Sequence, residues 1–158
     1  MNGSKRRTVL GVLLALQGIG AIGGAIFVVP NLSVDNLKSA IFPDYTIPAL
    51  GLGVLVGGGS LLALLLLLVH SRYEAFTAAG AGLAVMLFEV VEVTAMKGSV
   101  FTDPGQLPLW QQPLWFLIGA VIVLLAVGIS STRLQVRYEI ARASRKAAVA
   151  ASPPMTTV

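Results

Sequence analysis

Long apolar stretches separated by short polar segments dominate this 158-residue sequence. A helix needs about 20 apolar residues, each rising about 1.5 Å, to cross a hydrocarbon core roughly 30 Å thick. Four stretches reach that length, at residues 8–29, 49–69, 75–96 and 113–129. Proline ends helices because it lacks a backbone N–H, and the stretches are flanked by Pro30, Pro43, Pro48, Pro104, Pro108 and Pro113. The pattern predicts an all-α integral membrane protein, a four-helix bundle.

The remaining segments suggest three parts of the chain. We expect residues 1–131 to form the four-span transmembrane domain and residues 132–150 to form a basic helical extension. Residues 151–158 are predicted to be a disordered tail. The first span is predicted to stay attached as a signal anchor, because its apolar run exceeds the ~7–15 residues of a cleaved signal peptide. The second and third spans are joined by only residues 70–74, and such a short link favours antiparallel neighbours.

Lys and Arg are divided unevenly between the two sides of the predicted bundle. One side has only Lys38 and Lys97. The other has Lys5, Arg6, Arg7, Arg72, Arg133, Arg137, Arg142, Arg145 and Lys146. Because positively charged loops stay in the cytoplasm, this distribution predicts that both termini are cytoplasmic. The net charge of +4 is therefore interpreted as a topology signal, and no nucleic-acid partner is expected.

Composition excludes several classes of protein. Charged residues make up 11% of the chain, whereas soluble domains carry roughly 25%, so a soluble enzyme or a disordered regulator is excluded. The chain has no cysteine and a single histidine, His70, so cysteine-ligated cofactors and multi-histidine metal sites are not expected. Catalytic and nucleotide-binding motifs are missing from the sequence. We therefore expect a non-enzymatic protein without a cofactor.

Two acidic residues lie inside the third span. Glu89 and Glu92 are three residues apart and share a helical face in the half of the membrane distant from the cytoplasm. Buried charge costs several kcal/mol unless it is paired or neutralised, so at least one carboxyl should hold a proton or meet a cation. Lys97 could reach back toward the pair, and Gln17 could contact it from the first span. Three interpretations stay open: a structural hydrogen bond, a proton or cation transport step, or contact with a partner or lipid.

Glycines concentrate in the first two spans. Gly20 and Gly24, and likewise Gly53 and Gly57, show the four-residue spacing of small residues that lets membrane helices approach closely. Trp115 is predicted to lie at a similar depth. We favour close packing of the two helices, and the alternative is a cavity left for a lipid tail, a quinone or water.

The segment after the fourth span is basic. Arg133 and Arg137 lie one helical turn apart, separated by apolar residues. Their predicted partner is the anionic inner leaflet, at about 1 kcal/mol per basic residue. A plain cytoplasmic continuation of the fourth helix is the alternative.

Three segments together carry a resemblance to a known group of proteins. They are residues 18–24 (GIGAIGG), residues 42–48 (FPDYTIP) and residues 88–92 (FEVVE). In this combination the chain resembles a widespread set of small, uncharacterised bacterial four-span proteins. The resemblance implies a multi-pass protein of the bacterial inner membrane and supplies no activity. We expect a component that packs with lipids, further copies or a larger membrane complex. A small proton-linked or cation-linked transporter or channel using Glu89 and Glu92 is the alternative.

Overall fold

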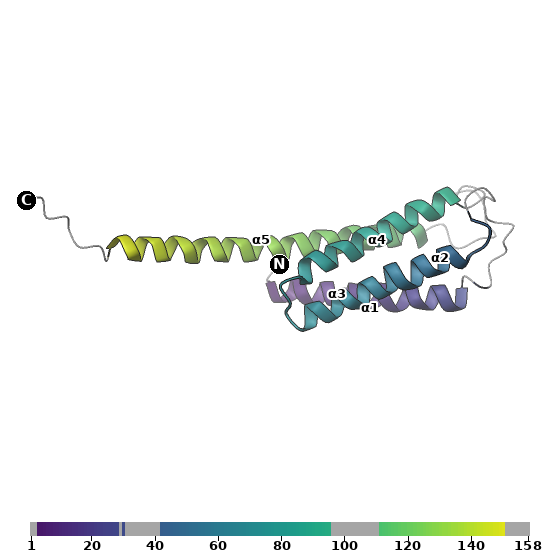
Figure 1. The fold of residues 1–158 in the computed structure, drawn as a ribbon, viewed down its shortest axis with the longest axis horizontal. Coiled ribbons are helices and arrows are strands. Elements are labelled where there is room, and N and C mark those ends of the chain that lie inside the picture. Colours follow the sequence, from purple (N-terminus) through teal and green to yellow (C-terminus); the bar gives the residue numbers. More distant parts are fainter. Residues whose placement is uncertain (1–2, 29, 31–41, 96–110, 151–158) are drawn as a thin grey trace, which may run out of the picture.

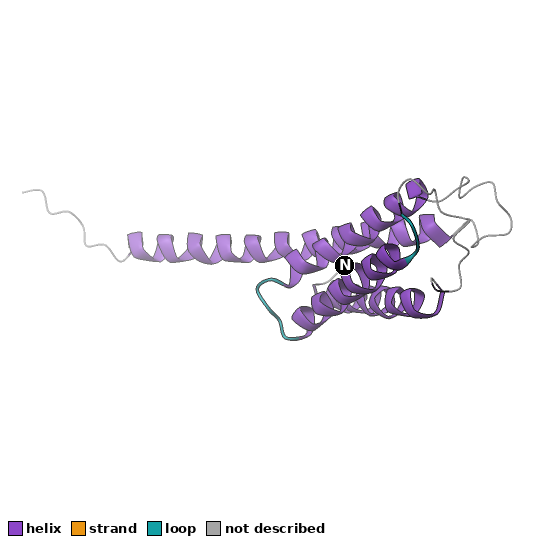
Figure 2. Cartoon of the chain, turned by 45° about the vertical axis from the view of Figure 1, so that its right-hand side comes forward, coloured by secondary structure: helices purple, strands orange, loops and turns teal. Residues whose placement is uncertain are grey.

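The described part of the chain is an all-helical bundle (Figures 1 and 2). The computed structural model describes residues 3–28, 30, 42–95 and 111–150. No β-strand occurs within those ranges. Four helical segments there are long and apolar enough to cross a membrane: Gly3–Phe27, Thr46–Leu68, Glu74–Glu92 and Pro113–Arg145. The predicted all-α four-span architecture is confirmed.

The first two spans each change helix type along their length. The first consists of α1 (Gly3–Gly23) followed by the π-helical segment η1 (Gly24–Val28). The second consists of α2 (Thr46–Leu50), the π-helical segment η4 (Gly51–Gly58) and α3 (Gly59–Leu68). Backbone angles stay right-handed where these segments meet, near φ −60° and ψ −42°, so the second span is one continuous rod.

The last two spans are regular α-helices, α4 (Glu74–Ala95) and α5 (Gln111–Ala150). Around the bundle, α1 contacts the second span and α5, and α4 contacts the same two neighbours. The helices α1 and α4 therefore face each other across the bundle diagonal. Polar contacts between these two helices pass through the core.

A tight turn reverses the chain between α3 and α4. The amide N–H of Ser71 donates to the carbonyl of Leu66 at 2.9 Å, and that of His70 donates to Leu67 at 3.3 Å, which is the Schellman pattern of a helix end. His70 has φ 56°, the left-handed conformation usually supplied there by glycine. The turn makes the second and third spans antiparallel neighbours, as the short link in the sequence predicts.

The helix α5 continues well past the bundle (Figure 1). The sequence separates a fourth span ending at residue 129 from an extension at residues 132–150, and the structure has one helix through both. Helical hydrogen bonding is retained across residues 129–132, because no proline or glycine lies between Gly128 and Ala150 to interrupt it. The extension is thus continuous with the fourth span, and this continuity agrees both with contact to the inner leaflet and with a plain cytoplasmic continuation. The predicted tail, residues 151–158, lies outside the described residues.

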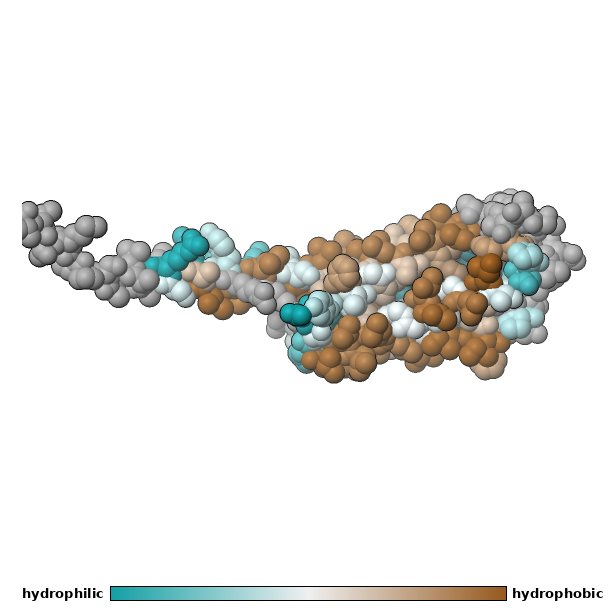
Figure 3. Space-filling model, viewed as in Figure 1, coloured by the Kyte–Doolittle hydropathy of each residue, from teal (hydrophilic) through white to brown (hydrophobic). Residues whose placement is uncertain are grey.

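Alanines and larger apolar side chains share the interior, and many large apolar side chains also point outward. The main buried cluster contains Ala63, Ala75, Ala78, Ala81 and Ala126 beside Leu10, Leu14, Leu67, Ile122 and Ile129. Outward-facing residues include Leu16, Ile19, Phe27, Leu55, Phe76 and Leu124. Hydrophobic residues cover the visible face of the bundle, and hydrophilic ones gather on the projecting part of α5 (Figure 3). Large apolar groups facing outward are suited to a lipid environment, where no water opposes their exposure.

Candidate functional site

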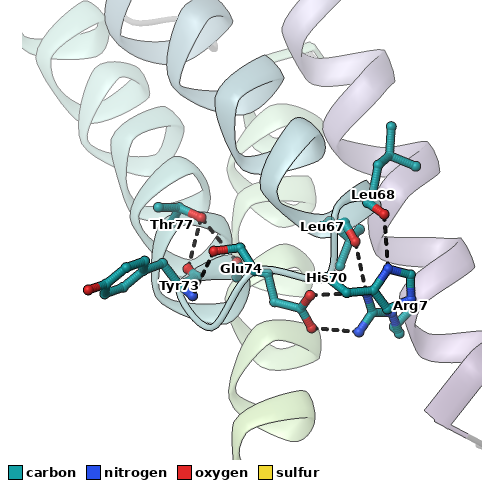
Figure 4. Close-up of polar contacts among 8 residues, drawn as sticks. Arg7, Leu67, Leu68, His70, Tyr73, Glu74 and Thr77 are labelled. Carbon is teal, nitrogen blue, oxygen red and sulfur yellow. Dashed lines mark hydrogen bonds and ion pairs between the residues drawn. The ribbon is translucent and has the colours of Figure 1, made fainter.

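At one end of the bundle, which we call the Arg7 end, a buried ion pair joins α1 to α4 (Figure 4). The Arg7 guanidinium donates from Nη1 to Oε1 of Glu74 at 2.7 Å and from Nη2 to Oε2 at 3.0 Å. Nη2 also donates to the carbonyl of Leu67 at 2.8 Å, at the end of α3. Glu74 is fully buried, and this two-pronged geometry satisfies both of its oxygens.

A second arginine links α1 to α5 at the same end. The Arg6 Nη1 donates to the carbonyl of Gly128 at 3.2 Å, and the guanidinium lies where a side chain at residue 128 would begin. Sequence reasoning used Arg6 and Arg7 only to orient the protein. The available signal for the ion pair was Glu74, an acid at the start of the third apolar span, because a carboxylate that becomes buried needs a cation nearby.

Midway along the bundle, Gln17 of α1 crosses the diagonal. Its Nε2 donates to the Ser60 hydroxyl at 2.8 Å and to the carbonyl of Ala81 at 3.1 Å. The Ser60 hydroxyl in turn donates to the Val56 carbonyl one turn earlier at 2.5 Å. Gln17 is completely buried, and its Oε1 has no hydrogen-bond partner among the described residues.

Apolar layers separate these polar contacts from each other. Between the Arg7 end and Gln17 lie fully buried residues from all four spans, namely Leu10, Leu14, Ala63, Ala78 and Ile122. Beyond Gln17 lies a second cluster of Ala21, Val56 and Val85, with Leu52, Phe88 and Trp115 packed around it. We call this second cluster the apolar floor, because the site described next lies directly above it.

Glu89 follows Val85 by one helical turn, so it lies on the same face of α4 immediately above the apolar floor. Glu89 is only 6% exposed, so it faces the bundle interior. We call this end of the bundle, opposite the Arg7 end, the Glu89 end. The Oε2 atom of Glu89 is buried and has no hydrogen-bond partner within the described residues. One oxygen of this carboxyl group is therefore buried without a hydrogen-bond donor among the described residues.

Glu92 and Tyr45 lie beside Glu89 at this end. Glu92 is partly buried, one turn further along α4. Tyr45 directly precedes α2, outside the membrane-spanning segment. Burial raises the pKa of the Tyr45 phenol, and the nearby Glu92 carboxylate raises that pKa further. The second span approaches this part of α4 at Gly51, where a side chain would begin 3.5 Å from the Phe88 ring.

The structure does not bring Gln17, another predicted member, to this site. Gln17 bonds to Ala81, which precedes Glu89 by about 12 Å of helix, so the Gln17 amide serves the middle of the bundle. Gln17 does not reach Glu89 because the packing of the helices places Ser60 and the Ala81 carbonyl beside Gln17, and both accept hydrogen bonds from its amide. Lys97 lies outside the described residues.

The predicted glycine contacts fall in two places. A side chain at Gly57 would begin 2.6 Å from Ile22, and one at Gly53 would begin 3.1 Å from the Ala25 Cβ, so both glycines let the first two spans approach. Gly24 similarly faces Leu52 at 3.2 Å. Gly20 instead faces α5, where the Trp115 ring lies 3.2 Å from the position a Cβ would take. Close packing accounts for all four glycines.

The closest approach of two helices was not predicted. On α4 and α5, a Cβ at Gly82 would lie 2.6 Å from the Gly119 carbonyl oxygen, and a Cβ at Gly119 would lie 2.7 Å from that of Gly82. The available signal was the presence of glycines in both apolar spans, and a glycine marks a contact only when the facing glycine is known.

The predicted lipid contacts are on the part of α5 that leaves the bundle. Arg133 and Arg137 lie one and two turns past Gly128, near the Arg7 end, and their side chains lie outside the described residues. Contact with anionic lipid stays a prediction. Among the described residues, no three His, Asp or Glu side chains gather in a way that could hold a metal ion.

Comparison with protein-family models, with curated proteins and with solved structures gave no match. Functional argument for this chain therefore depends on its own residues.

Proposed function

We propose that this chain is a non-enzymatic integral membrane protein of the bacterial inner membrane that packs with partner subunits or lipids, with both termini in the cytoplasm. The observation that carries the proposal is the closed interior. Fully buried apolar side chains lie between the Arg7–Glu74 pair and Gln17, and the apolar floor lies between Gln17 and Glu89. Charged species crossing such layers would lose their hydration without compensation.

The surface supports the same role. Large apolar side chains such as Phe76, Leu55 and Leu124 point outward and offer area for contacts between helices or with acyl chains. The projecting part of α5 adds exposed basic residues, including Arg142 and Arg145, beyond the Arg7 end. With Arg6 and Arg7 at that end too, the positive-inside rule favours placing it in the cytoplasm.

A proton-linked or cation-linked transporter or channel is the second candidate, and one observation favours it. Glu89 is buried in the membrane-spanning part of α4 with an unpartnered oxygen, and acids in such positions commonly serve ion binding. A transporter would need the apolar layers to separate during its cycle, or a second copy to complete the route.

Reconstitution separates the two candidates. The full chain is placed in proteoliposomes at known density, and proton, Na⁺ and K⁺ flux is measured beside donor–acceptor energy transfer between labelled copies. The packing role predicts flux equal to that of empty liposomes, together with saturable association of copies or tight retention of lipid after extraction in mild detergent. Flux that is abolished by Glu89→Gln would establish the transporter instead. A monomer that retains no protein or lipid would contradict the packing role.

A further inference from the structure

The starting observation is a difference in charge compensation along α4. Every oxygen of the Glu74 carboxylate has a donor, whereas Oε2 of Glu89 has none among the described residues. Only 6% of Glu89 is exposed, so bulk water does not supply the missing partner. A buried polar atom without a partner needs an explanation, and a bound group supplied from outside the bundle is one such explanation.

Among the described residues, the groups of the bundle interior that could donate to Glu89 are too distant to fill this role. Arg7 is committed to Glu74, which precedes Glu89 by about 22 Å of helix. The Gln17 amide donates to Ser60 and Ala81 below the apolar floor. Because the floor closes the side toward the Arg7 end, a group that reaches Glu89 must come from the Glu89 end.

The surroundings favour one kind of cation. Phe88 and Trp115 pack around the floor beneath Glu89. Aromatic faces attract ammonium cations, and the carbon atoms attached to nitrogen add apolar contact. Ca²⁺ and Mg²⁺ instead require six or more oxygen ligands, and the described residues present no such cluster.

We propose that Glu89, with Glu92, forms a binding site for an ammonium group entering from the Glu89 end of the bundle. The carboxylates supply the counter-charge, and the aromatic residues receive the carbon atoms attached to nitrogen. The ammonium can belong to the headgroup of a phospholipid or to a soluble organic amine, and both present the same chemistry to the site. This inference rests on the proposed lipid-packing and partner-packing function and names the chemistry of its ligand.

Binding to the full chain in maltoside micelles tests the proposal, since the detergent carries no ammonium. Two probes are used: phosphatidylethanolamine, compared by native mass spectrometry with phosphatidylglycerol of the same acyl chains, and benzyltrimethylammonium, measured by titration calorimetry. We expect at least one probe to bind and Glu89→Gln to weaken that binding at least tenfold. Glu139→Gln removes an equal charge from the exposed part of α5 and is expected to leave the affinity unchanged.

The pattern of results identifies the source of the ammonium. Preference for phosphatidylethanolamine over phosphatidylglycerol that disappears in Glu89→Gln supports a lipid headgroup, and binding of benzyltrimethylammonium alone supports a soluble amine. Failure of both probes to bind overturns the proposal, as does affinity within threefold of native in Glu89→Gln. If Glu89→Gln melts below the native protein, Glu92→Gln decides the question, since native affinity in that variant also overturns the site.

The result is distinguishable from the fate of the proposed function. Association of copies is measured by energy transfer in the same preparations, with and without the probes. A chain that binds ammonium but neither associates nor retains lipid keeps this site and loses the packing role. A chain whose copies associate with native strength but that binds no ammonium keeps the packing role and loses this site.

Discussion

Two glutamates on α4 occupy opposite ends of the bundle and have opposite surroundings. Glu74 begins the helix, is fully buried and receives both prongs of the Arg7 guanidinium. Glu89 lies about 22 Å further along the same helix, is nearly as buried, and has an oxygen without a described partner. Burial of an acid alone therefore does not mark a functional site. The presence or absence of a compensating cation separates a structural carboxylate from a candidate site.

The backbone differs between the two ends as well. At the Arg7 end, regular α-helix leads into a hydrogen-bonded turn, and arginines tie α1 to the other spans. At the Glu89 end, the π-helical segments η1 and η4 lie against each other, with glycines at their contacts. Segments of π-helix are less regular and occur frequently at functional sites. The contacts at the Arg7 end thus anchor α1 to the other spans, whereas the Glu89 end is where we propose that a ligand binds.

The largest expected effect comes from breaking the ion pair. Arg7→Ala leaves the Glu74 carboxylate buried without its cation, and we expect a loss of about 3 kcal/mol in the free energy of unfolding. Denaturation in mixed micelles followed by circular dichroism measures the change. Arg72→Ala is the control, because Arg72 lies in the adjoining turn over the Tyr73 ring and should contribute below about 1 kcal/mol. Equal losses in the two variants would contradict an anchoring role for Arg7.

The next largest effect tests the packing that separates the two ends. Gly82→Ala places a methyl group 2.6 Å from the Gly119 carbonyl oxygen, so α4 and α5 must move apart, at a cost of about 2 kcal/mol. Gly80→Ala, two residues away, meets nothing within 4 Å and should be neutral or stabilising by up to about 1 kcal/mol. Thermal unfolding in detergent compares them. A similar melting temperature for both alanine variants would mean that the close approach does not matter.

A smaller effect with opposite signs at the two glutamates sharpens the comparison most directly. Glu89→Gln removes a charge that has no described partner, and we expect stability to rise by about 1 kcal/mol. Glu74→Gln removes a charge that Arg7 compensates, and stability should fall. Both variants are unfolded under the same conditions. Destabilisation by both would indicate that Glu89 has a structural role resembling that of Glu74.

The smallest effect concerns the start of the second span. The Asp44 carboxylate accepts a hydrogen bond from the Thr46 N–H at 2.8 Å, and this bond lowers the pKa of Asp44. Since the folded state lowers this pKa, the hydrogen bond contributes to the free energy of unfolding at pH values above the ordinary pKa of about 3.9. That contribution is lost as the pH falls through the pKa of the folded state. The chemical shift of the Thr46 amide should therefore depend on pH. Asp44→Asn should abolish this pH dependence while leaving the melting temperature unchanged. A pH titration that is the same in the variant would contradict the assignment.

Specific residues show how far the sequence determined the molecule. Apolar length alone predicted four spans, because about 20 residues must cover the hydrocarbon and the backbone must bond within each helix. The sequence also located Glu89 and Glu92 within a span, and it indicated that Gly24, Gly53 and Gly57 permit close contact. It also predicted a fourth span followed by a helical extension, and the structure has both within the single helix α5, which runs unbroken to Ala150.

Tertiary structure alone decided which polar groups meet. Helical periodicity gives the face on which a residue lies, but not which residue of another helix stands opposite at the same height. Packing assigned Arg7 to Glu74 and Gln17 to Ser60, and it left Glu89 above an apolar floor. It also matched Gly82 with Gly119, two glycines that the sequence separates by the rest of α4, the residues that connect α4 to α5 and the start of α5. The one-dimensional pattern fixed membrane crossing because that depends on summed hydrophobicity, whereas pairing depends on the rotation and height of each helix against its neighbours.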